Sequence, residues 1–116
     1  MGHLLENQVY LELKKNIRVG QKLAYWRTRQ QTEVDFVLAK DDRLLPIEVK
    51  RRDTEAVPKN IVSFCEKYAC PHAIVLNKNF WHTRQVGQTQ VHFLPAFLAG
   101  KVTWWFELLS AHGALP

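Results

Sequence analysis

The chain of 116 residues has few cysteines and no long hydrophobic run. Its two cysteines are too few for the disulfide framework that holds many small secreted domains together. No apolar stretch approaches the ~20 residues that a membrane-spanning helix needs, and charges interrupt the apolar residues after Met1 where a signal peptide would lie. We therefore expect a cytoplasmic protein with no membrane association.

Glycine-rich nucleotide-binding motifs are also absent. Neither G-x-x-x-x-G-K-[ST] nor G-x-G-x-x-G occurs in the sequence, so it offers no recognised cradle for a nucleotide. The sequence shows no internal repeat, low-complexity segment or interdomain linker, and its length suits one domain. We expect residues 1–116 to form a single domain.

The cysteines lie close together in the sequence. Cys65, Cys70 and His72 have a C-x4-C-x-H spacing that matches no common zinc pattern, and no second pair of ligands is evident. Buried thiols are the favoured interpretation, and a zinc site is the alternative.

Positive charge is in excess and is unevenly spread. The net charge is +5, and residues 14–52 contain eleven of the sixteen Lys and Arg residues but only five of the eleven Asp and Glu residues. A local basic surface of this kind attracts the phosphate backbone of nucleic acids. A soluble domain that is merely basic is an equally valid interpretation of charge alone.

Hydrophobic periodicity predicts an α/β fold with a mixed sheet. Three segments with alternating apolar residues form an antiparallel meander, and the strand–helix–strand order that follows predicts a right-handed parallel crossover. We expect the strand over 89–94 to lie at an edge of the sheet. The expected elements are helices over 3–16 and 58–69, a short helix over 95–99, an apolar segment over 102–109, and strands over 22–27, 33–39, 44–50, 72–76 and 89–94.

The meander makes a geometric prediction about its acidic residues. If the turn over 40–43 is symmetric, the numbers of facing residues sum to 83, so Asp35 lies opposite Glu48. Alternation then places Asp35, Glu48 and Lys50 on one face. The other face takes the apolar residues Val34, Phe36, Leu38, Ile47 and Val49.

Two facing carboxylates need a reason to be close. Cβ atoms of facing residues lie ~4.5–5.5 Å apart, and like charges there destabilise a sheet unless one takes a proton or a cation sits between them. Asp35 and Glu48 suit Mg²⁺ or Mn²⁺, because hard cations prefer oxygen ligands. Lys50 could then orient the attacking water or stabilise developing charge in phosphodiester hydrolysis. The alternative is an exposed charged face in which Lys50 neutralises Glu48.

The order Glu6, Asp35, Glu48-Val49-Lys50 resembles the PD-(D/E)XK nuclease superfamily, which includes many restriction endonucleases. The segments GHLLENQVYLEL, YWRTRQQTEVDFVL and LPIEVK resemble more narrowly the C-terminal domain of unknown function of prokaryotic AAA-type ATPases. The resemblance implies a restriction-endonuclease-like mixed sheet flanked by helices. It also implies that Asp35 and Glu48 are metal ligands, Lys50 the catalytic lysine and Glu6 a supporting acid.

The resemblance has departures. Some nucleases of the superfamily carry Gln-x-x-x-Tyr on the helix after the lysine, whereas Phe64 stands four residues before Tyr68 here. The ATPase half is absent, so we expect a fragment or a stand-alone relative. Because branches of the superfamily have lost activity, the runner-up function is an inactive DNA- or partner-binding module that accompanies an AAA-type ATPase.

Four arginines and an aromatic run complete the candidate surface. Arg27, Arg29, Arg51 and Arg52 could contact phosphates that flank the scissile bond, which positions DNA without specifying its sequence. The alternative is that they are ordinary solvent-exposed side chains at the ends of strands. Residues 104–106 (Trp-Trp-Phe) are either core or an interface with an ATPase domain or a second copy.

Overall fold

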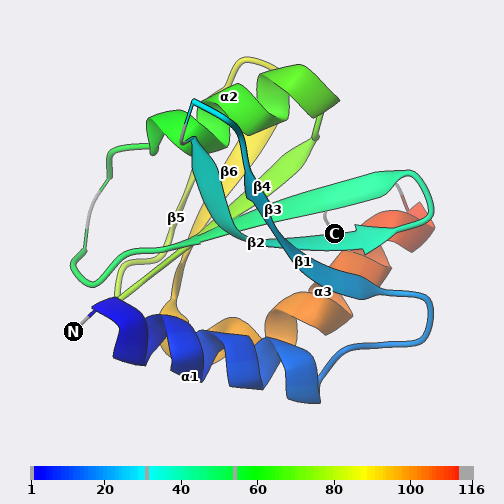
Figure 1. Ribbon diagram of the computed structural model, residues 1–116, viewed down its shortest axis with the longest axis horizontal. Coiled ribbons are helices and arrows are strands. Elements are labelled where there is room, and N and C mark those ends of the chain that lie inside the picture. The colour runs from blue at the N-terminus through cyan, green and yellow to red at the C-terminus, as the bar shows by residue number, and fades with distance from the viewer. Residues whose placement is uncertain (1, 31, 54, 113–116) are drawn as a thin grey trace.

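The computed structural model describes residues 2–30, 32–53 and 55–112 (Figure 1). Within these residues, no helix is both long and apolar enough to cross a membrane. The elements are α1 (Gly2–Lys15), β1 (Lys22–Arg27), β2 (Glu33–Lys40), β3 (Arg43–Val49), α2 (Lys59–Tyr68), β4 (His72–Asn77), β5 (His82–Val86), β6 (Thr89–Pro95), the 3-10 helix η1 (Ala96–Leu98) and α3 (Ala99–His112).

The strands form one mixed sheet in the order β1-β2-β3-β4-β6-β5. β1, β2 and β3 pair antiparallel, β4 pairs parallel with both β3 and β6, and β5 returns antiparallel beside β6. The predicted meander and parallel crossover are therefore confirmed. The predicted edge position of residues 89–94 is wrong, because β5 covers that side of β6 and is itself the edge.

Helices cover both faces of the sheet (Figure 1). Val9 and Leu13 of α1 are buried with Val102 and Phe106 of α3 against one face. α2 covers the other face with Ile61, Phe64 and Cys65. The apolar stripes that predicted α1 and α2 are thus the residues that hold the helices on the sheet. Burial of apolar area at ~25 cal/mol per Å² is the main stabilising contribution of such packing.

The hairpin between β2 and β3 has the predicted register. Lys40 faces Arg43 across a two-residue turn, and the pairing continues without a shift as far as Phe36 and Ile47. Asp41 takes a φ of 57° in this turn, a left-handed conformation that Asp tolerates better than most residues. This short turn therefore fixes which residues of β2 and β3 meet.

A β-bulge interrupts the predicted alternation of β2. Tyr25 of β1 faces both Asp35 and Phe36 of β2, because the β1–β2 register shifts by one residue there. Val34 consequently lies among the buried residues under α2, together with Val37. The prediction that Val34 shares a face with Phe36 is wrong, since Phe36 packs against the opposite cluster, under α1.

The aromatic run of α3 divides between core and surface. Phe106 is buried, Trp105 is partly buried, and Trp104 is half exposed. Only Trp104 is therefore accessible enough to contribute to an interface.

Candidate functional site

β2 and β3 diverge at the end of their ladder, where β2 curves toward α2 (Figure 1). Beyond Phe36 and Ile47, side chains replace the regular main-chain pairing. The backbone N–H of Asp35 donates to Glu48 Oε1 over 3.2 Å, and the backbone N–H of Val49 donates to Asp35 Oδ2 over 2.8 Å. We call this group of residues, Asp35 of β2 together with Glu48, Val49 and Lys50 at the end of β3, the fork. The carboxylate of each strand is thus held by a backbone N–H of the other strand.

The bulge and the turn together produce this exchange. The turn sets Asp35 beside Glu48. The bulge then shifts Asp35 from the position that regular alternation would give it, and its carboxylate reaches the main chain of β3. Bulges often re-aim a side chain next to a functional site. The predicted proximity of Asp35 and Glu48 is confirmed in this form.

Glu48 is held by partners from several elements. Its side chain is 8% exposed, and its Oε2 accepts a hydrogen bond of 2.7 Å from Asn60 Nδ2 of α2. Asn60 also donates to the backbone carbonyl of Glu33. Lys50 Nζ lies 3.8 Å from the same Glu48 oxygen, and its backbone N–H donates to the Leu76 carbonyl over 2.7 Å. The fork is therefore fixed to both α2 and β4.

Sequence reasoning missed Asn60. It stands four residues before Phe64, on the side of α2 that packs on the sheet, so a polar residue at the end of an apolar stripe was the available signal. Its orientation toward Glu48 depends on how α2 docks, which periodicity alone does not define.

Both carboxyl groups of the fork resist ionisation. The pKa of Glu48 is raised to about 7, mainly by burial and also by the nearby Asp35 carboxylate, against the opposing effects of Asn60 and Lys50. Burial also raises the pKa of Asp35, partly offset by its hydrogen bonds with Val49 and Glu48. A pair of this kind binds either a proton or a cation near neutral pH. This is the electrostatic arrangement that the sequence predicted.

A basic cavity of about 480 Å³ adjoins the fork. Its lining includes Glu6 of α1 and the run from Val49 to Arg52. Arg51 and Arg52 are exposed. Asp53 fixes this loop, because its Oδ1 accepts hydrogen bonds from the backbone N–H groups of Asn79 (2.7 Å) and Phe80 (3.0 Å). The structure thus brings together Glu6, Lys50, Arg51 and Arg52.

The other two predicted arginines lie at the end of β1 and in the turn after it. Arg27 is exposed and forms an ion pair with Glu33, with 2.9 Å between Arg27 Nε and Glu33 Oε2. Arg29 is exposed in the turn that follows β1. Neither lines the basic cavity. The ion pair uses only Arg27 Nε, so the other N–H groups of this exposed guanidinium remain able to contact a phosphate.

The donor set of the fork suits a hard cation. Among the described residues, no group of three or more His, Cys, Asp and Glu side chains is placed to hold a metal. Asp35 and Glu48 could therefore supply two carboxylates at most. Mg²⁺ is often held by one or two carboxylates, with water and substrate oxygens completing its shell. The two oxygen ligands therefore fit Mg²⁺ or Mn²⁺ better than a metal that needs a closed protein cage.

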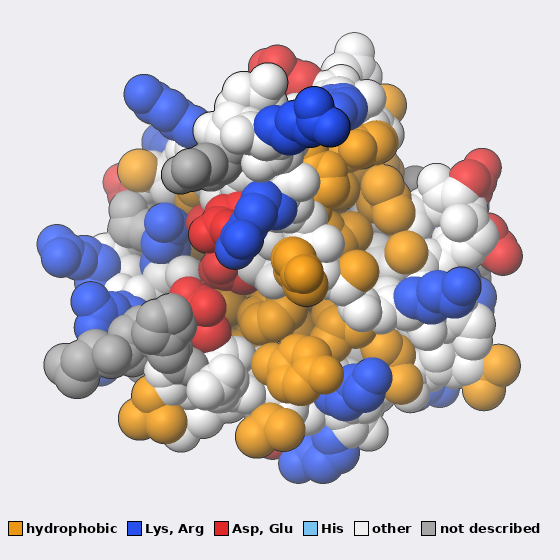
Figure 2. Space-filling view, viewed as in Figure 1, with side chains coloured by type: hydrophobic (Ala, Val, Ile, Leu, Met, Phe, Trp, Pro, Cys, Tyr) orange, Lys and Arg blue, Asp and Glu red, His pale blue; other side chains and the backbone are white. Residues whose placement is uncertain are grey.

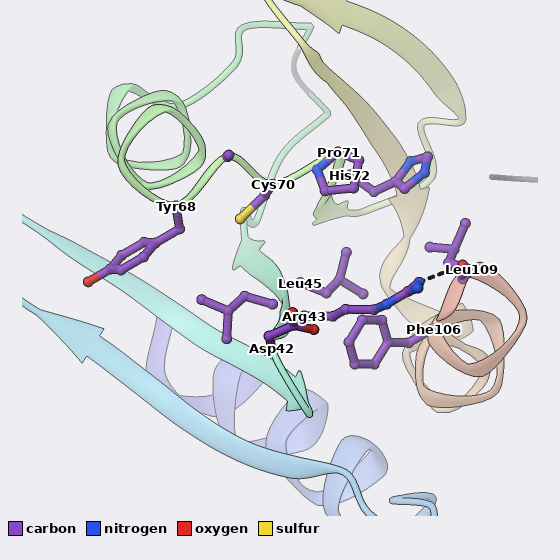
Figure 3. Close-up of a pocket in the computed structure, with 11 residues that line it drawn as sticks. Asp42, Arg43, Leu45, Tyr68, Cys70, Pro71, His72, Phe106 and Leu109 are labelled. Atoms are coloured by element: carbon purple, nitrogen blue, oxygen red, sulfur yellow. Dashed lines mark hydrogen bonds between the residues drawn. The ribbon is translucent and has the colours of Figure 1, made fainter. Parts of the chain in front are cut away.

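The cysteine region does not form such a site. Cys65 and Cys70 are buried free thiols, and within the described part of the chain no group of three or more His, Cys, Asp and Glu side chains gathers around His72. Figure 3 shows the cavity that Cys70 and His72 line, about 400 Å³ in volume, at the opposite end of β3 from Lys50. Arg43 crosses it and donates to the Leu109 carbonyl over 3.2 Å.

Comparison with known proteins assigns a family. Residues 1–97 match the family described as "Domain of unknown function (DUF4143)". No curated protein matches the chain. The matched residues include the whole fork and the basic cavity.

Proposed function

The chain belongs to the DUF4143 family of domains of unknown function, and we propose that its fork is a divalent-metal site that hydrolyses phosphodiester bonds of DNA. One observation carries the proposal. Asp35 and the Glu48–Val49 segment exchange hydrogen bonds across the end of the β2–β3 ladder, which holds two carboxylates and Lys50 at one place.

The acidic pair has the chemistry of a cation site. Its two carboxylates are partly desolvated and close together, so a divalent cation would relieve a repulsion that otherwise requires a proton. Asp35 and Glu48 are the residues that would hold Mg²⁺ or Mn²⁺. When bound, such an ion neutralises charge on the scissile phosphate and favours ionisation of an attacking water.

Lys50 supplies the positive side chain of the proposed reaction. Its side chain is 41% exposed while its backbone N–H is bonded to β4, so the lysine extends from a fixed strand end. In the proposed reaction it donates hydrogen bonds to the phosphate or to the attacking water. Donors aimed at developing negative charge contribute about 10²–10³-fold to a rate.

The basic cavity is the proposed path of the DNA backbone. Arg51 and Arg52 contact phosphates there, and Glu6 at the same cavity supports the acidic pair. Contacts of this kind give affinity without sequence preference and weaken as salt rises.

Cleavage of supercoiled DNA tests the proposal. With Mg²⁺ or Mn²⁺ present, we expect the wild type to nick the plasmid and Asp35→Asn or Glu48→Gln to leave it intact. Asp42→Asn is the matched control, because Asp42 is an exposed carboxylate in the turn of the same hairpin. Equal cleavage by all four proteins, or by none, would contradict the proposal.

A second candidate is an inactive module that binds DNA or a protein partner beside an AAA-type ATPase. The specific observation in its favour is that both Glu48 oxygens already accept hydrogen bonds, one from Asp35 and one from Asn60. The ATPase partner follows from the resemblance of the EVDF and IEVK segments. Salt-sensitive DNA binding that survives Asp35→Asn, with no cleavage by the wild type, would favour this candidate.

A further inference from the structure

An aromatic cavity of about 590 Å³ borders Asp35. Its lining consists of Tyr10 from α1, residues 23–25 from β1, and Asp35 and Phe36 from β2. Tyr25 is 75% exposed and Tyr10 is 41% exposed. The Tyr10 and Phe36 rings lie 6.1 Å apart with an angle of 31° between their planes. Aromatic rings are therefore accessible from solvent directly beside one of the two carboxylates.

Two connections join the aromatic cavity to the basic cavity. Asp35 lines the aromatic cavity and accepts a hydrogen bond from Val49, which lines the basic cavity. On α1, Glu6 lines the basic cavity, and Tyr10, one turn later on the same side of the helix, lines the aromatic one. The order across the surface is thus cationic, acidic, aromatic.

Figure 2 shows this succession on one face of the molecule. Acidic side chains gather between cationic side chains and a broad apolar area that continues across the face. Large exposed apolar areas in small proteins usually mark an interaction site.

We propose that the aromatic cavity stacks an unpaired base of the substrate next to the phosphodiester bond that the fork cleaves. This inference rests on the proposed function and names its substrate class, a nucleic acid with single-stranded nucleotides at the cleavage site. The basic cavity contacts the backbone on one side of the fork, and Tyr10 and Tyr25 contact a base on the other. The volume of the aromatic cavity is within the ~300–1,000 Å³ of typical ligand sites.

Stacking chemistry selects single strands over duplex. In a duplex the base faces are covered by neighbouring base pairs, and exposing one costs unstacking. In a single strand the faces are free, and each base stacked on an aromatic side chain raises affinity by about 10- to 100-fold. Because every base has such a face, the cavity provides no sequence readout.

Charge favours a nucleic acid over a protein as the occupant. A protein docked on Tyr10 and Tyr25 has no need of the carboxylate pair, or of Arg51 and Arg52 in the basic cavity on the other side of the fork. A nucleotide strand uses all three, with its phosphates at the cationic and metal-binding groups and its base at the rings.

Binding measured without cleavage tests the inference. Fluorescence anisotropy would follow a short labelled oligothymidylate and a labelled duplex in EDTA at fixed salt. Tyr25→Ala and Tyr10→Ala should each weaken single-strand binding about 10-fold and change duplex binding less than about twofold. Tyr25→Phe should retain affinity. Trp104→Ala is the matched control, since this half-exposed tryptophan lies outside the aromatic cavity.

Several outcomes would overturn the inference. One is equal weakening of both probes, and another is unchanged single-strand binding in Tyr25→Ala and Tyr10→Ala. A third is a wild-type dimer, seen by sedimentation, that Tyr25→Ala converts to a monomer without affecting single-strand affinity. That result would make this face an interface between copies of the chain.

The same variants separate this inference from the proposed function. Cleavage by wild type together with undiminished single-strand cleavage by Tyr25→Ala and Tyr10→Ala would retain the metal site and reject base stacking. Ring-dependent single-strand binding by a wild type that never cleaves would retain base stacking and reject hydrolysis. Far-UV circular dichroism would verify that each variant is folded.

Discussion

A pair of carboxylates and a pair of imidazoles lie in different surroundings in this protein. In the fork, Asp35 and Glu48 lie next to Asn60, Lys50 and the Val49 amide. Among the described residues these groups offer hydrogen bonds and a positive charge, so they favour ionised carboxylates. The aromatic and basic cavities open beside the pair.

The second pair consists of His72 and His92 in neighbouring strands β4 and β6. His72 Nδ1 and His92 Nε2 lie 3.0 Å apart, and the rings stack at 5.2 Å. Thr83 Oγ1 lies 3.2 Å from His92 Nδ1, and Trp105 meets the His92 ring edge-on. Burial, and then the neighbouring His72, lower the pKa of His92 to about 4, while burial lowers the pKa of His72.

Burial favours the neutral form in both pairs, but only the fork provides neighbouring groups that stabilise the charged form. The imidazole pair has hydroxyl and aromatic neighbours, so it is suited to remain neutral inside the core. The carboxylate pair combines desolvation with hydrogen-bond donors and an adjacent lysine, which is the environment that binding of a cation requires. We infer that the histidine pair is structural and the carboxylate pair functional.

Among changes that leave both carboxylates in place, removing the lysine of the fork should have the largest effect. Lys50→Ala should lower kcat by about 10²–10³-fold, because a donor aimed at developing negative charge is lost. Initial rates of DNA cleavage at saturating Mn²⁺ would measure it. Lys67→Ala is a suitable control, since this lysine lies over the Trp26 and Tyr68 rings, away from the fork. Unchanged cleavage in Lys50→Ala would remove the lysine from the proposed reaction.

Acid should destabilise the folded protein through its imidazole pair. Between pH 6.5 and about 4 the unfolded chain binds a proton at His92 that the native protein does not, so the free energy of unfolding falls as pH falls through this range. The full loss is about 3 kcal/mol, from a pKa difference near 2.5. Urea unfolding at several pH values would measure the slope.

Glu48 of the fork changes stability with pH in the opposite direction to His92, so the acid titration needs a variant that lacks the Glu48 carboxyl group. The raised pKa of Glu48 means that the native protein binds an extra proton between pH 4.5 and about 7, which stabilises it as pH falls. The comparison is therefore Glu48→Gln against Glu48→Gln/His92→Gln. A slope that stays the same when His92 is removed would show that the histidine pair does not carry the pH dependence.

Removing the amide partner of Glu48 should weaken metal binding without abolishing it. Asn60→Ala leaves both carboxylates but loses the 2.7 Å hydrogen bond that orients Glu48. Groups that orient a metal ligand are typically worth 10–100-fold in affinity. Titration calorimetry with Mn²⁺ would detect the loss, and Asn79→Ala provides an amide-to-alanine control in the β4–β5 turn. No change in Asn60→Ala would indicate that Glu48 needs no such support.

The smallest expected effect is on stability. Asp35→Asn removes one of two mutually repelling, partly desolvated carboxylates, so it should stabilise the metal-free protein by about 1 kcal/mol, as is common when a functional site is neutralised. Urea unfolding in EDTA at pH 8 would measure the difference. A loss of stability would show that the Asp35 bond to the Val49 amide outweighs the repulsion.

The sequence predicted the hairpin and its register because local rules determine both. Alternating apolar residues define β2 and β3, and a two-residue turn sets which of their residues meet. The proximity of Asp35 and Glu48 followed from that register alone. The bulge was not predictable, because it depends on Val34 packing under α2, a contact between elements that are distant in the sequence.

Two other features escaped sequence analysis for related reasons. β5 consists largely of exposed polar residues, so it carries no apolar alternation, and only its pairing with β6 makes it a strand. The aromatic cavity combines Tyr10 from α1 with Tyr25 from β1, and no sequence spacing connects two elements that meet only after folding.

The central claim is that the acidic pair of the fork binds a divalent cation, and Mn²⁺ titration by calorimetry tests it most directly. The wild type and Asp42→Asn should bind Mn²⁺, and the Asp35→Asn/Glu48→Gln double variant should not. Each protein would be measured with and without a short DNA, because substrate oxygens can complete the metal shell. Absence of binding in the wild type under both conditions, or equal binding by the double variant, would contradict the account.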